Sequence, residues 1–455
     1  MNKFILRGSL GFLFLSVALS SCKSSQEVAA KKEPVGINLG YMDKSVNPAD
    51  DFNRYVNGTW LDKTEIPADR TRWGSFDELR KNTDNDVMAI LKEAINDKTI
   101  DPNSDQAKAI NLYKSVLDTV TRNKQGIEPL KPYLAKINAV QNADQLVALL
   151  AEMEPEMGLG FFGSYIGADA KNSNKNVIYV GTGSLGLPDR DYYVSDAPDN
   201  KEKREKYVAH VTRMLQFIGE SEATANANAK KILALETKMS TATLDRVQRR
   251  DRRNTYNPMS FTDLQKLAPT VKWDTYFQTV GIGKVDSLVV SQPKYIQTVE
   301  TILKENQVED WKAYMRWTAL RGSAGLLSTD IENANFDFYG KTLTGAVKQR
   351  PAEERALATV NGRLGEALGK LYVAKKFPPE AKEKAQVMIA NVMKAFDNRI
   401  DNLPWMTKAT KENAKIKLNK FRVKIGYPDK WKDYSELQVK SPEQGGTYFD
   451  NSRMY

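Results

Sequence analysis

The sequence predicts a mainly α-helical protein that contains one short β-hairpin. Apolar residues recur every three or four positions over most of the 455 residues, which places them on one face of a helix. Serine or asparagine precedes several of these stretches and glycine follows them, as at helix ends. The alternation typical of strands is confined to residues 158–193. The length allows about three ordinary domains or fewer large ones.

The first residues have the pattern of an export signal followed by a lipid attachment site. Lys3 and Arg7 precede an apolar run, residues 10–19, that is too short to span a bilayer but suits a signal peptide. The sequence Leu-Ser-Ser-Cys22 that follows resembles the lipobox of bacterial lipoproteins, in which the cysteine is acylated. Cys22 is the only cysteine, so its lipidation would leave no thiol for disulfides, metal binding or nucleophilic catalysis.

These signals predict the organisation of the N-terminal region and the location of the protein. We expect a lipoprotein signal peptide at residues 1–21 and a flexible polar tether at residues 22–48. Two or three acyl chains would hold the protein stably on a membrane. The expected location is therefore the bacterial cell envelope, on the outer-membrane or periplasmic face.

The basic balance of the chain does not by itself indicate a nucleic-acid partner. The sequence has 67 basic and 57 acidic residues, for a formal charge of +10, and the two signs are interspersed as on ordinary solvated helix faces. The densest basic run, Arg246–Arg253, has no aromatic residues between its arginines on which bases could stack. We therefore expect no nucleic acid, and interpret the run as forming salt bridges or lining the path of an acidic substrate.

The segment from Asp51 to Arg80 carries several structural signals. The Asn57-Gly58 dipeptide predicts a chain reversal, and Ile66-Pro67 predicts the end of any helix. Ser75 and Glu78 form a capping-box pattern that predicts a helix start. The buried face of that helix is expected to contain Leu79, Val87, Ile90, Leu91, Ala94 and Ile95, and the expected core aromatic residues are Tyr55, Trp60, Trp73 and Phe76.

The remaining elements follow from the same signals. Ser104 is expected to cap one helix, which Gly126 ends, and Asn142 with Gln145 is expected to cap another. The Gly-rich stretch 158–193 predicts a hairpin, and Pro258-Met-Ser260 is read as a break. Further helices are expected at residues 207–218, 222–240, 311–327, 352–377, 380–400 and 407–421.

The chain lacks the residues for several kinds of catalytic site. His210 is the only histidine, so neither H-E-x-x-H nor any other two-histidine zinc site can form within these residues. His210 lies on a helix whose core face holds Tyr207 and Met214, so we interpret it as a packing residue and not as a ligand. No serine lies in a G-x-S-x-G elbow. The G-x-G-x-x-G match at residues 181–186 is followed by Pro188, which opposes the required helix, so we read it as a turn.

Several longer motifs resemble one enzyme family. In order, they are Tyr-Val-Asn-Gly-Thr-Trp-Leu61, Arg-Trp-Gly-Ser-Phe-Asp-Glu-Leu-Arg80, Leu-Gly-Leu-Pro-Asp-Arg-Asp-Tyr-Tyr193, Tyr-Asn-Pro-Met259, residues 365–372, Leu-Pro-Trp-Met406 and Ile-Gly-Tyr-Pro-Asp429. This series is similar to the start of the ectodomain in the neprilysin and endothelin-converting-enzyme family of zinc metallopeptidases. The resemblance implies that residues 49–430 form the family's large multi-helical lid domain. Residues 431–455 would begin the connection to the thermolysin-like zinc half, which is absent from this sequence.

The resemblance also implies a substrate, a cofactor and two binding residues. Full-length members hydrolyse peptides with zinc, which an H-E-x-x-H helix and a later glutamate bind, and no residue of this chain matches that metal site or a catalytic residue. Arg72 and Arg80 match by position the arginines that reach toward the C-terminal end of the substrate. A guanidinium can hold a carboxylate through two parallel hydrogen bonds, although both arginines could instead form surface or interdomain salt bridges.

The sequence leaves three functional hypotheses open. In the first, these residues are the N-terminal part of a zinc metalloendopeptidase and are inactive alone. In the second, the protein is a non-catalytic peptide-binding or scaffolding lipoprotein. In the third, it is one half of a split peptidase, and a separate chain supplies the catalytic half.

Overall fold

The computed structural model describes residue 36 and residues 38–158 and 160–453, and the chain divides into two compact units, Met1–Glu65 and Ile66–Tyr455. The signal peptide, Cys22 and the first part of the tether lie outside the described residues. Among the described residues, no helix is both long enough and apolar enough to cross a membrane.

Helix α1 (Phe52–Lys63) belongs to the first unit and contradicts the turn expected at Asn57-Gly58. The Asp51 side chain caps this helix by accepting a hydrogen bond from the Arg54 backbone N–H at 2.8 Å. Gly58 is buried in the middle of the helix, and a Cβ at this position would lie 2.5 Å from the Cβ of Asp43. The glycine therefore allows a close approach of the preceding chain, and the turn prediction is wrong. The helix ends before Ile66-Pro67, in agreement with the expected stop.

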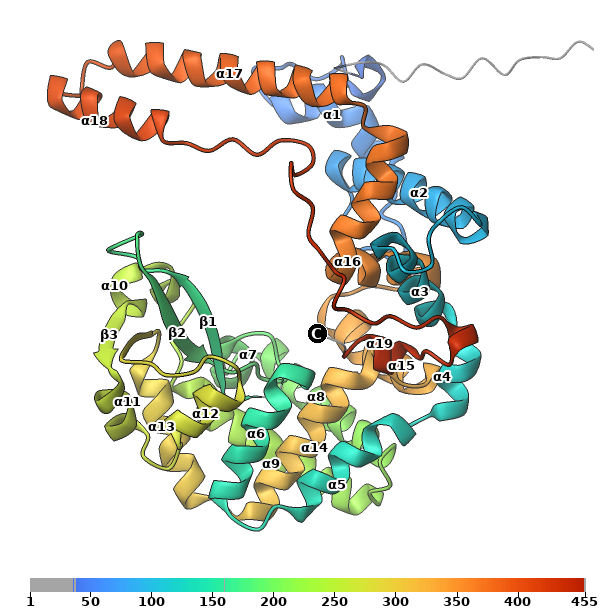
Figure 1. Ribbon diagram of the computed structural model, residues 1–455, viewed down its shortest axis with the longest axis vertical. Helices are drawn as coiled ribbons and strands as arrows, with labels where there is room; N and C mark the ends of the chain where they lie inside the picture. Colours follow the sequence, from blue (N-terminus) through green and yellow to red (C-terminus); the bar gives the residue numbers. More distant parts are fainter. Residues whose placement is uncertain (1–35, 37, 159, 454–455) are drawn as a thin grey trace, which may run out of the picture. The chain divides into compact units, whose positions relative to one another are not determined.

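The second unit is mainly helical (Figure 1). Its helices are α2 (Ser75–Asn96), α3 (Asp105–Leu117), α4 (Thr119–Gln125), α5 (Lys131–Ala139), α6 (Ala143–Met157), α7 (Arg190–Val194), α8 (Pro198–Gln216), α9 (Glu222–Thr241), α10 (Arg252–Thr255), α11 (Phe261–Leu267), α12 (Trp273–Thr279), α13 (Pro293–Glu305), α14 (Val308–Ser323), α15 (Thr329–Phe336), α16 (Ala352–Lys376), α17 (Pro379–Asp401), α18 (Lys408–Asn419) and α19 (Tyr448–Asn451). A π-helix, Asp337–Leu343, continues α15. The predicted mainly helical fold class is confirmed.

A small sheet accompanies the helices. It consists of β1 (Phe162–Ala168), β2 (Asn176–Thr182), β3 (Asn257–Ser260) and β4 (Ser287–Val290), in the order β1-β2-β4-β3. β1 and β2 form the expected antiparallel hairpin, whereas β2 and β4 pair in parallel. The break read at Pro258-Met-Ser260 is strand β3. Its proline is tolerated because β3 is an edge strand of the sheet.

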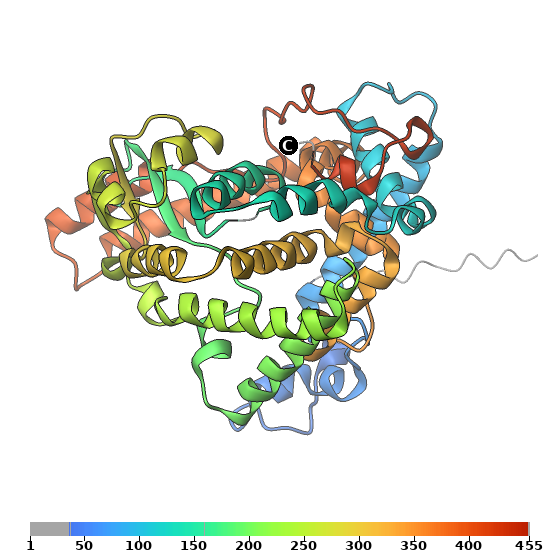
Figure 2. The same cartoon turned by 90° about the horizontal axis from the view of Figure 1, so that it is seen from below.

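The second unit contains two apolar cores. In the larger core, α14 packs against the α5–α6 and α8–α9 pairs, whose helices run alongside it in Figure 2. Trp311 and Trp317 of α14 are almost fully buried there. The smaller core joins α2, α3 and α16 through residues that include Leu91, Leu112 and Val360. This smaller core holds α2 against α16, the two helices that form the site described below.

Most of the predicted helix starts are confirmed, and the local differences have physical causes. Ser104 and Asn142 cap α3 and α6 through their side-chain oxygens, as expected. Helix α2 does begin at Ser75, but Gly74 is its N-cap and no capping box forms. Phe76 and Leu79 are 86% and 61% exposed, so they do not belong to the core. The first turns of α2 extend beyond the smaller core, which begins to cover this helix near Val87.

Helices α17 and α18 form an arm that carries many exposed apolar side chains. The two helices pack on each other, and Lys415 of α18 forms ion pairs with Asp397 and Asp401 of α17 (Figure 1). Large apolar residues that are at least 45% exposed on the arm and the segment after it are Val387, Met388, Val392, Phe396, Trp405, Ile416, Phe421 and Val423. Such a concentration of exposed apolar surface is typical of an interaction site.

Candidate functional site

One wall of the candidate site is formed by the loop before α2 and by the first turns of that helix. Arg72 lies in the loop, and Arg80 and Asp84 lie one turn apart on α2. The acidic residues Asp77 and Glu78 occupy the first turn, where negative charge stabilises the N-terminal end of a helix. The local sequence therefore starts the helix where it presents Arg80 and Asp84 toward α16.

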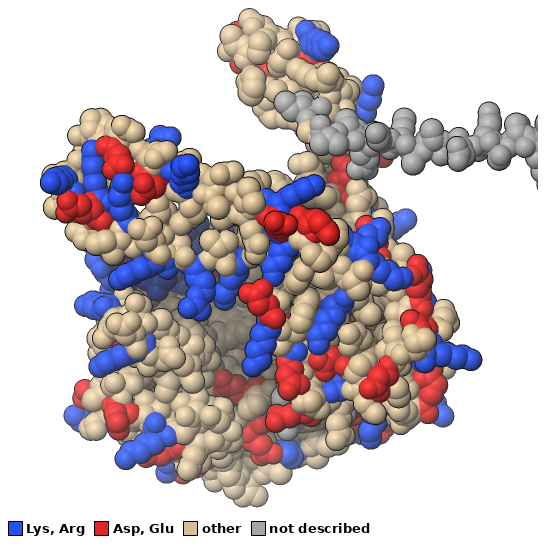
Figure 3. Space-filling view, turned by 45° about the horizontal axis from the view of Figure 1, so that its top comes forward, with Lys and Arg blue, Asp and Glu red and all other residues tan. Residues whose placement is uncertain are grey.

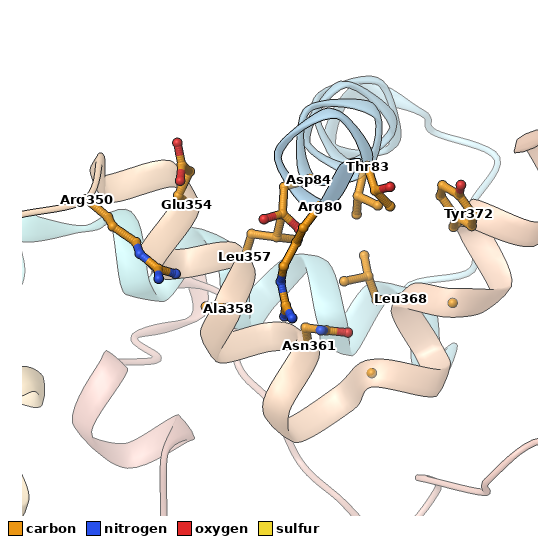
Figure 4. A pocket seen from close by; sticks show the side chains of 13 residues that line it. Arg80, Thr83, Asp84, Arg350, Glu354, Leu357, Ala358, Asn361, Leu368 and Tyr372 are labelled. Atoms are coloured by element: carbon orange, nitrogen blue, oxygen red, sulfur yellow. The ribbon is translucent and has the colours of Figure 1, made fainter. Parts of the chain in front are cut away.

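The opposite wall is the N-terminal half of α16 and the loop that precedes it. Figure 4 shows Arg80 extending from α2 toward Asn361 of α16, with Arg350 in the loop before α16. Helix α16 bends at Leu364, whose φ and ψ angles of −123° and 35° are not helical. Gly362 and Gly365 flank this residue, and glycine pairs are a common cause of helix kinks.

Glu354 neutralises two of the cations at this site. Its side chain is only 5% exposed, and it accepts a hydrogen bond from Arg70 at 2.6 Å and another from Lys81. Burial alone would raise the pKa of Glu354, but the hydrogen bonds from Lys81 and Arg70 outweigh that effect and lower it. Arg355 is likewise paired, at 3.1 Å from Glu332. These carboxylates fix three basic side chains in the wall of the site.

We expect the substitution Glu354→Ala to lower the free energy of unfolding by about 2–3 kcal/mol. The reason is that it leaves Arg70 and Lys81 without their shared carboxylate in a partly buried place. The neighbouring Glu353→Ala is the matched control, because Glu353 is 46% exposed and makes a surface pair with Lys92. This control should cost no more than about 0.5 kcal/mol. Denaturant unfolding measures both values, and equal losses for the two variants would contradict the anchoring role of Glu354.

Three other cations of the site are not paired. Among the described residues, no hydrogen bond or ion pair is formed by the side chains of Arg80, Lys348 and Arg350. The acid that interacts with Arg80 and Arg350 is Asp84. Burial raises its pKa, and the positive charges of Arg80, Arg350 and Lys81 offset only part of that effect. Two guanidinium groups, Arg80 and Arg350, therefore face one carboxylate, Asp84, and a net positive charge remains.

Two adjoining cavities lie at these residues. The larger, of about 710 Å³, is polar and is lined by both Arg72 and Arg80. The smaller, of about 210 Å³, lies between α2 and α16. Arg80, Asp84 and Arg350 line both cavities. Basic side chains also lie around a hollow on the face seen in Figure 3, although acidic residues are interspersed over much of the same surface.

The structure places the two arginines predicted from the sequence at the same larger cavity, and both are exposed. Arg72 is 86% exposed, and its Nε lies 3.9 Å from Asp77. Arg80 reaches further, into the space between the two helices (Figure 4). Sequence reasoning missed Lys348 and Arg350. The only available signal was the Lys-Gln-Arg-Pro351 stretch before a predicted helix, and its partner helix is more than 250 residues away in the sequence. The binding role of Arg72 and Arg80 stays a prediction.

The basic run Arg246–Arg253 forms salt bridges, as one of the two interpretations expected. Arg246 and Arg249 both pair with Asp189, at 3.2 and 2.7 Å, and Arg253 pairs with Asp251 at 2.6 Å. None of these arginines lines either of the two cavities described above.

The sequence matches the model of a known protein family. The family model described as "Peptidase family M13" matches residues 48–428. The chain belongs to peptidase family M13. M13 relatives include endothelin-converting enzyme 1 of Cavia porcellus, which is 28% identical over 437 residues, covering 92% of this chain and 56% of the relative. Neprilysin-3 of Drosophila melanogaster is 30% identical over 438 residues, covering 91% of this chain and 55% of the relative.

Solved structures agree with the M13 assignment. The zinc metalloprotease Zmp1 of Mycobacterium tuberculosis, in complex with an inhibitor, superposes with a TM-score of 0.84 and 34% identity, covering 93% of this chain and 63% of Zmp1. PepO of Lactobacillus rhamnosis has the same fold, with a TM-score of 0.78 and 20% identity. The chain spans between about half and two thirds of the length of these relatives.

The described residues do not fit the zinc ion that an M13 peptidase requires. Within them, no group of three or more histidine, cysteine or acidic residues is arranged to hold a metal ion. His210 is buried on α8 with its Nε2 unpaired, and its ring stacks on Phe338 at 4.8 Å. Burial, together with the charge of Arg213, lowers the pKa of His210 to about 3. His210 is therefore a packing residue, as expected, and we assign no step of zinc chemistry to these residues.

Proposed function

We propose that these residues are the substrate-handling part of a neprilysin-like zinc metallopeptidase that hydrolyses peptides. The observation that carries the proposal is the pair of adjoining cavities beside α2, where Arg80 and Arg350 form no ion pair with a carboxylate within an M13 fold. Both arginines are exposed at the edge of these cavities, and an unpaired guanidinium there suits a carboxylate of the substrate. In this proposal, Arg72 and Arg80 hold the C-terminal end of the peptide, and the zinc half lies in sequence that this chain does not contain.

The exposed apolar surface of the α17–α18 arm supports a further part of the proposal. Apolar side chains such as Met388, Val392 and Phe396 are spaced four residues apart and therefore share one face of α17. A soluble protein rarely exposes such a face unless a partner covers it. We propose that the metal-bearing half, in the same chain or in a second one, covers this face. These residues alone are expected to show no zinc-dependent hydrolysis.

We also propose that the protein is exported and anchored in the bacterial cell envelope through acylated Cys22. The support is the sequence pattern of the first 22 residues. A lipid anchor would hold the peptide-binding region close to the membrane surface while the polar tether allows it to reorient.

The decisive experiment captures the native product from its own cells with an antibody to residues 66–455. Its intact mass, its N-terminal peptide and its cleavage of a quenched fluorogenic peptide are then measured with and without a zinc chelator. We expect a mass well above that of these 455 residues. We also expect an acylated N-terminal peptide that begins at Cys22, and hydrolysis that the chelator abolishes.

Two other results would favour the remaining hypotheses. A product with the mass of these residues that cleaves only together with a co-captured second chain would establish a split peptidase. A product of the same mass without any chelator-sensitive hydrolysis would overturn the peptidase proposal, and would leave a non-catalytic peptide-binding or scaffolding lipoprotein.

A further inference from the structure

We infer that Arg350, acting with Arg80, binds the terminal carboxylate of peptides whose last side chain is apolar and enters the small cavity between α2 and α16. This inference rests on the proposed peptide-handling function and specifies the substrate class. It assigns a specificity-determining role to Arg350, a residue that was not selected from the sequence.

The cations around the site differ in whether a carboxylate pairs with them. Arg70 and Lys81 both form ion pairs with Glu354, and Arg355 forms one with Glu332. These three positive charges are therefore already neutralised within the protein. Arg72 points largely to solvent beside Asp77. Within the described part of the chain, Arg80 and Arg350 are the guanidinium groups that line both cavities and form no ion pair. Asp84 also lines both cavities and interacts electrostatically with both arginines, so two positive charges face one carboxylate. The two arginines are therefore the groups that remain available to a ligand anion.

The small cavity has both apolar and polar residues in its lining. Val87 of α2 and the buried Leu357 and Leu368 of α16 form the apolar part of its lining. Polar side chains, among them Thr83, Asp84, Glu354 and Asn361, form much of the rest. Gly365 and Gly369 complete the α16 side. A volume of about 210 Å³ is below the range of about 300–1,000 Å³ typical of whole small-molecule sites. The cavity thus has room for one side chain, with cations at its edge.

The substrate class follows from the position of the two cations. Arg80 and Arg350 line the boundary that the small cavity shares with the larger polar one. A peptide that places its last side chain in the small cavity brings its terminal carboxylate to this boundary, where Arg80 and Arg350 can donate hydrogen bonds to it. The preceding residues of the peptide then lie in the larger cavity. Asn361, whose side chain faces Arg80, offers a further polar group for the peptide end (Figure 4).

The test measures the binding of fluorescein-labelled pentapeptides to the full 455-residue chain by fluorescence anisotropy. The reference peptide, Gly-Ala-Gly-Ala-Leu, has a free carboxylate. A second has the same sequence with a carboxamide end, and a third ends in glycine with a free carboxylate. A fourth ends in aspartate carboxamide, which separates a side-chain carboxylate from a terminal one. We expect the reference peptide to bind at least tenfold more tightly than each of the others.

The variants isolate the role of each arginine. Arg80→Ala and Arg350→Ala should each weaken binding of the reference peptide by about 10–100-fold and leave the carboxamide peptide unchanged, because hydrogen bonds to a charged group are the strong ones. Arg350→Lys should recover only part of the affinity, since an ammonium group lacks the planar fork. Arg252→Ala is the matched control, because Arg252 is exposed and lines neither cavity, and it should have no effect.

The outcomes separate this inference from the proposed function. If Arg80→Ala weakens binding and Arg350→Ala does not, the role of Arg350 is refuted while the peptidase proposal stands. Equal affinity for the free acid and the carboxamide, or no binding of any peptide by the folded wild-type chain, overturns the inference. Selective binding by a native product that hydrolyses nothing would uphold the inference and refute the peptidase.

Discussion

The substitution Glu236→Ala is expected to destabilise the second unit by about 4 kcal/mol. Glu236 of α9 is fully buried and ties the α8–α9 pair to the Leu-Gly-Leu-Pro segment that follows β2. Its carboxylate accepts hydrogen bonds from the Gly186 backbone N–H at 3.0 Å and from the hydroxyls of Tyr193 and Tyr207 at 2.9 and 2.8 Å. Burial raises its pKa, and the charge of Arg321 and these three hydrogen bonds act in the opposite direction. Removing the carboxylate leaves several buried donors without an acceptor and also creates a cavity.

Two further variants show whether the hydrogen bonds cause this loss. Glu236→Gln keeps the side-chain volume and an oxygen that can accept from Gly186, so it should cost only about 1–2 kcal/mol. Lys230→Ala, at an exposed position on the same helix, should change stability by less than about 0.5 kcal/mol. Denaturant unfolding followed by tryptophan fluorescence measures these differences. A loss below about 1 kcal/mol for Glu236→Ala would show that the network does not hold this segment.

The unfolding free energy of the wild-type protein is expected to fall more steeply on acidification than that of a His210→Phe variant. The pKa of His210 is lowered from 6.5 to about 3, mainly by burial and then by Arg213, whereas Asp337 acts in the opposite direction. Between these two pH values, the unfolded chain binds a proton that the folded chain does not bind. The contribution of His210 to stability is therefore complete above pH 6.5 and is lost as the pH falls toward 3.

The size of this effect follows from the shift. Each pH unit within the window costs about 1.4 kcal/mol, so the loss between pH 7 and pH 5 should be about 2 kcal/mol. Phenylalanine cannot titrate, and it can keep the stacking on Phe338. Thermal and denaturant unfolding at pH 7, 6 and 5 give the slope of the unfolding free energy against pH for each protein. The two slopes are compared, so a difference in absolute stability between the two proteins does not affect the test. Parallel slopes for the two proteins would mean that His210 binds its proton in the folded state.

Local patterns were sufficient to predict most of the long helices and the hairpin. The caps at Ser104 and Asn142 could be predicted because a helix cap depends only on the few residues that follow it. The turn expected at Asn57-Gly58 failed because the packing of Asp43 against Gly58 is a tertiary contact. Strand β3 was missed for the same reason, since its pairing partner β4 lies about thirty residues further along the chain.

The candidate site was predicted only in part. Arg72 and Arg80 could be selected because they lie in a motif shared with a known family, but nothing in the sequence indicated which of the two would reach α16. The pairing of Arg70 and Lys81 with Glu354 links positions more than 270 residues apart. That pairing determines which positive charges are neutralised and which remain available.

The sequence by itself determined the helical fold class, the family and the residue types that can bind a carboxylate. It also excluded a two-histidine metal site within these residues, because only one histidine is present. The tertiary structure alone decided that Arg350 joins Arg80 at the small cavity between α2 and α16, which Arg72 does not line. The physical reason is that helix periodicity and capping depend on neighbours in the sequence. Charge neutralisation and cavity shape depend instead on which distant side chains the packing of α2 against α16 brings together.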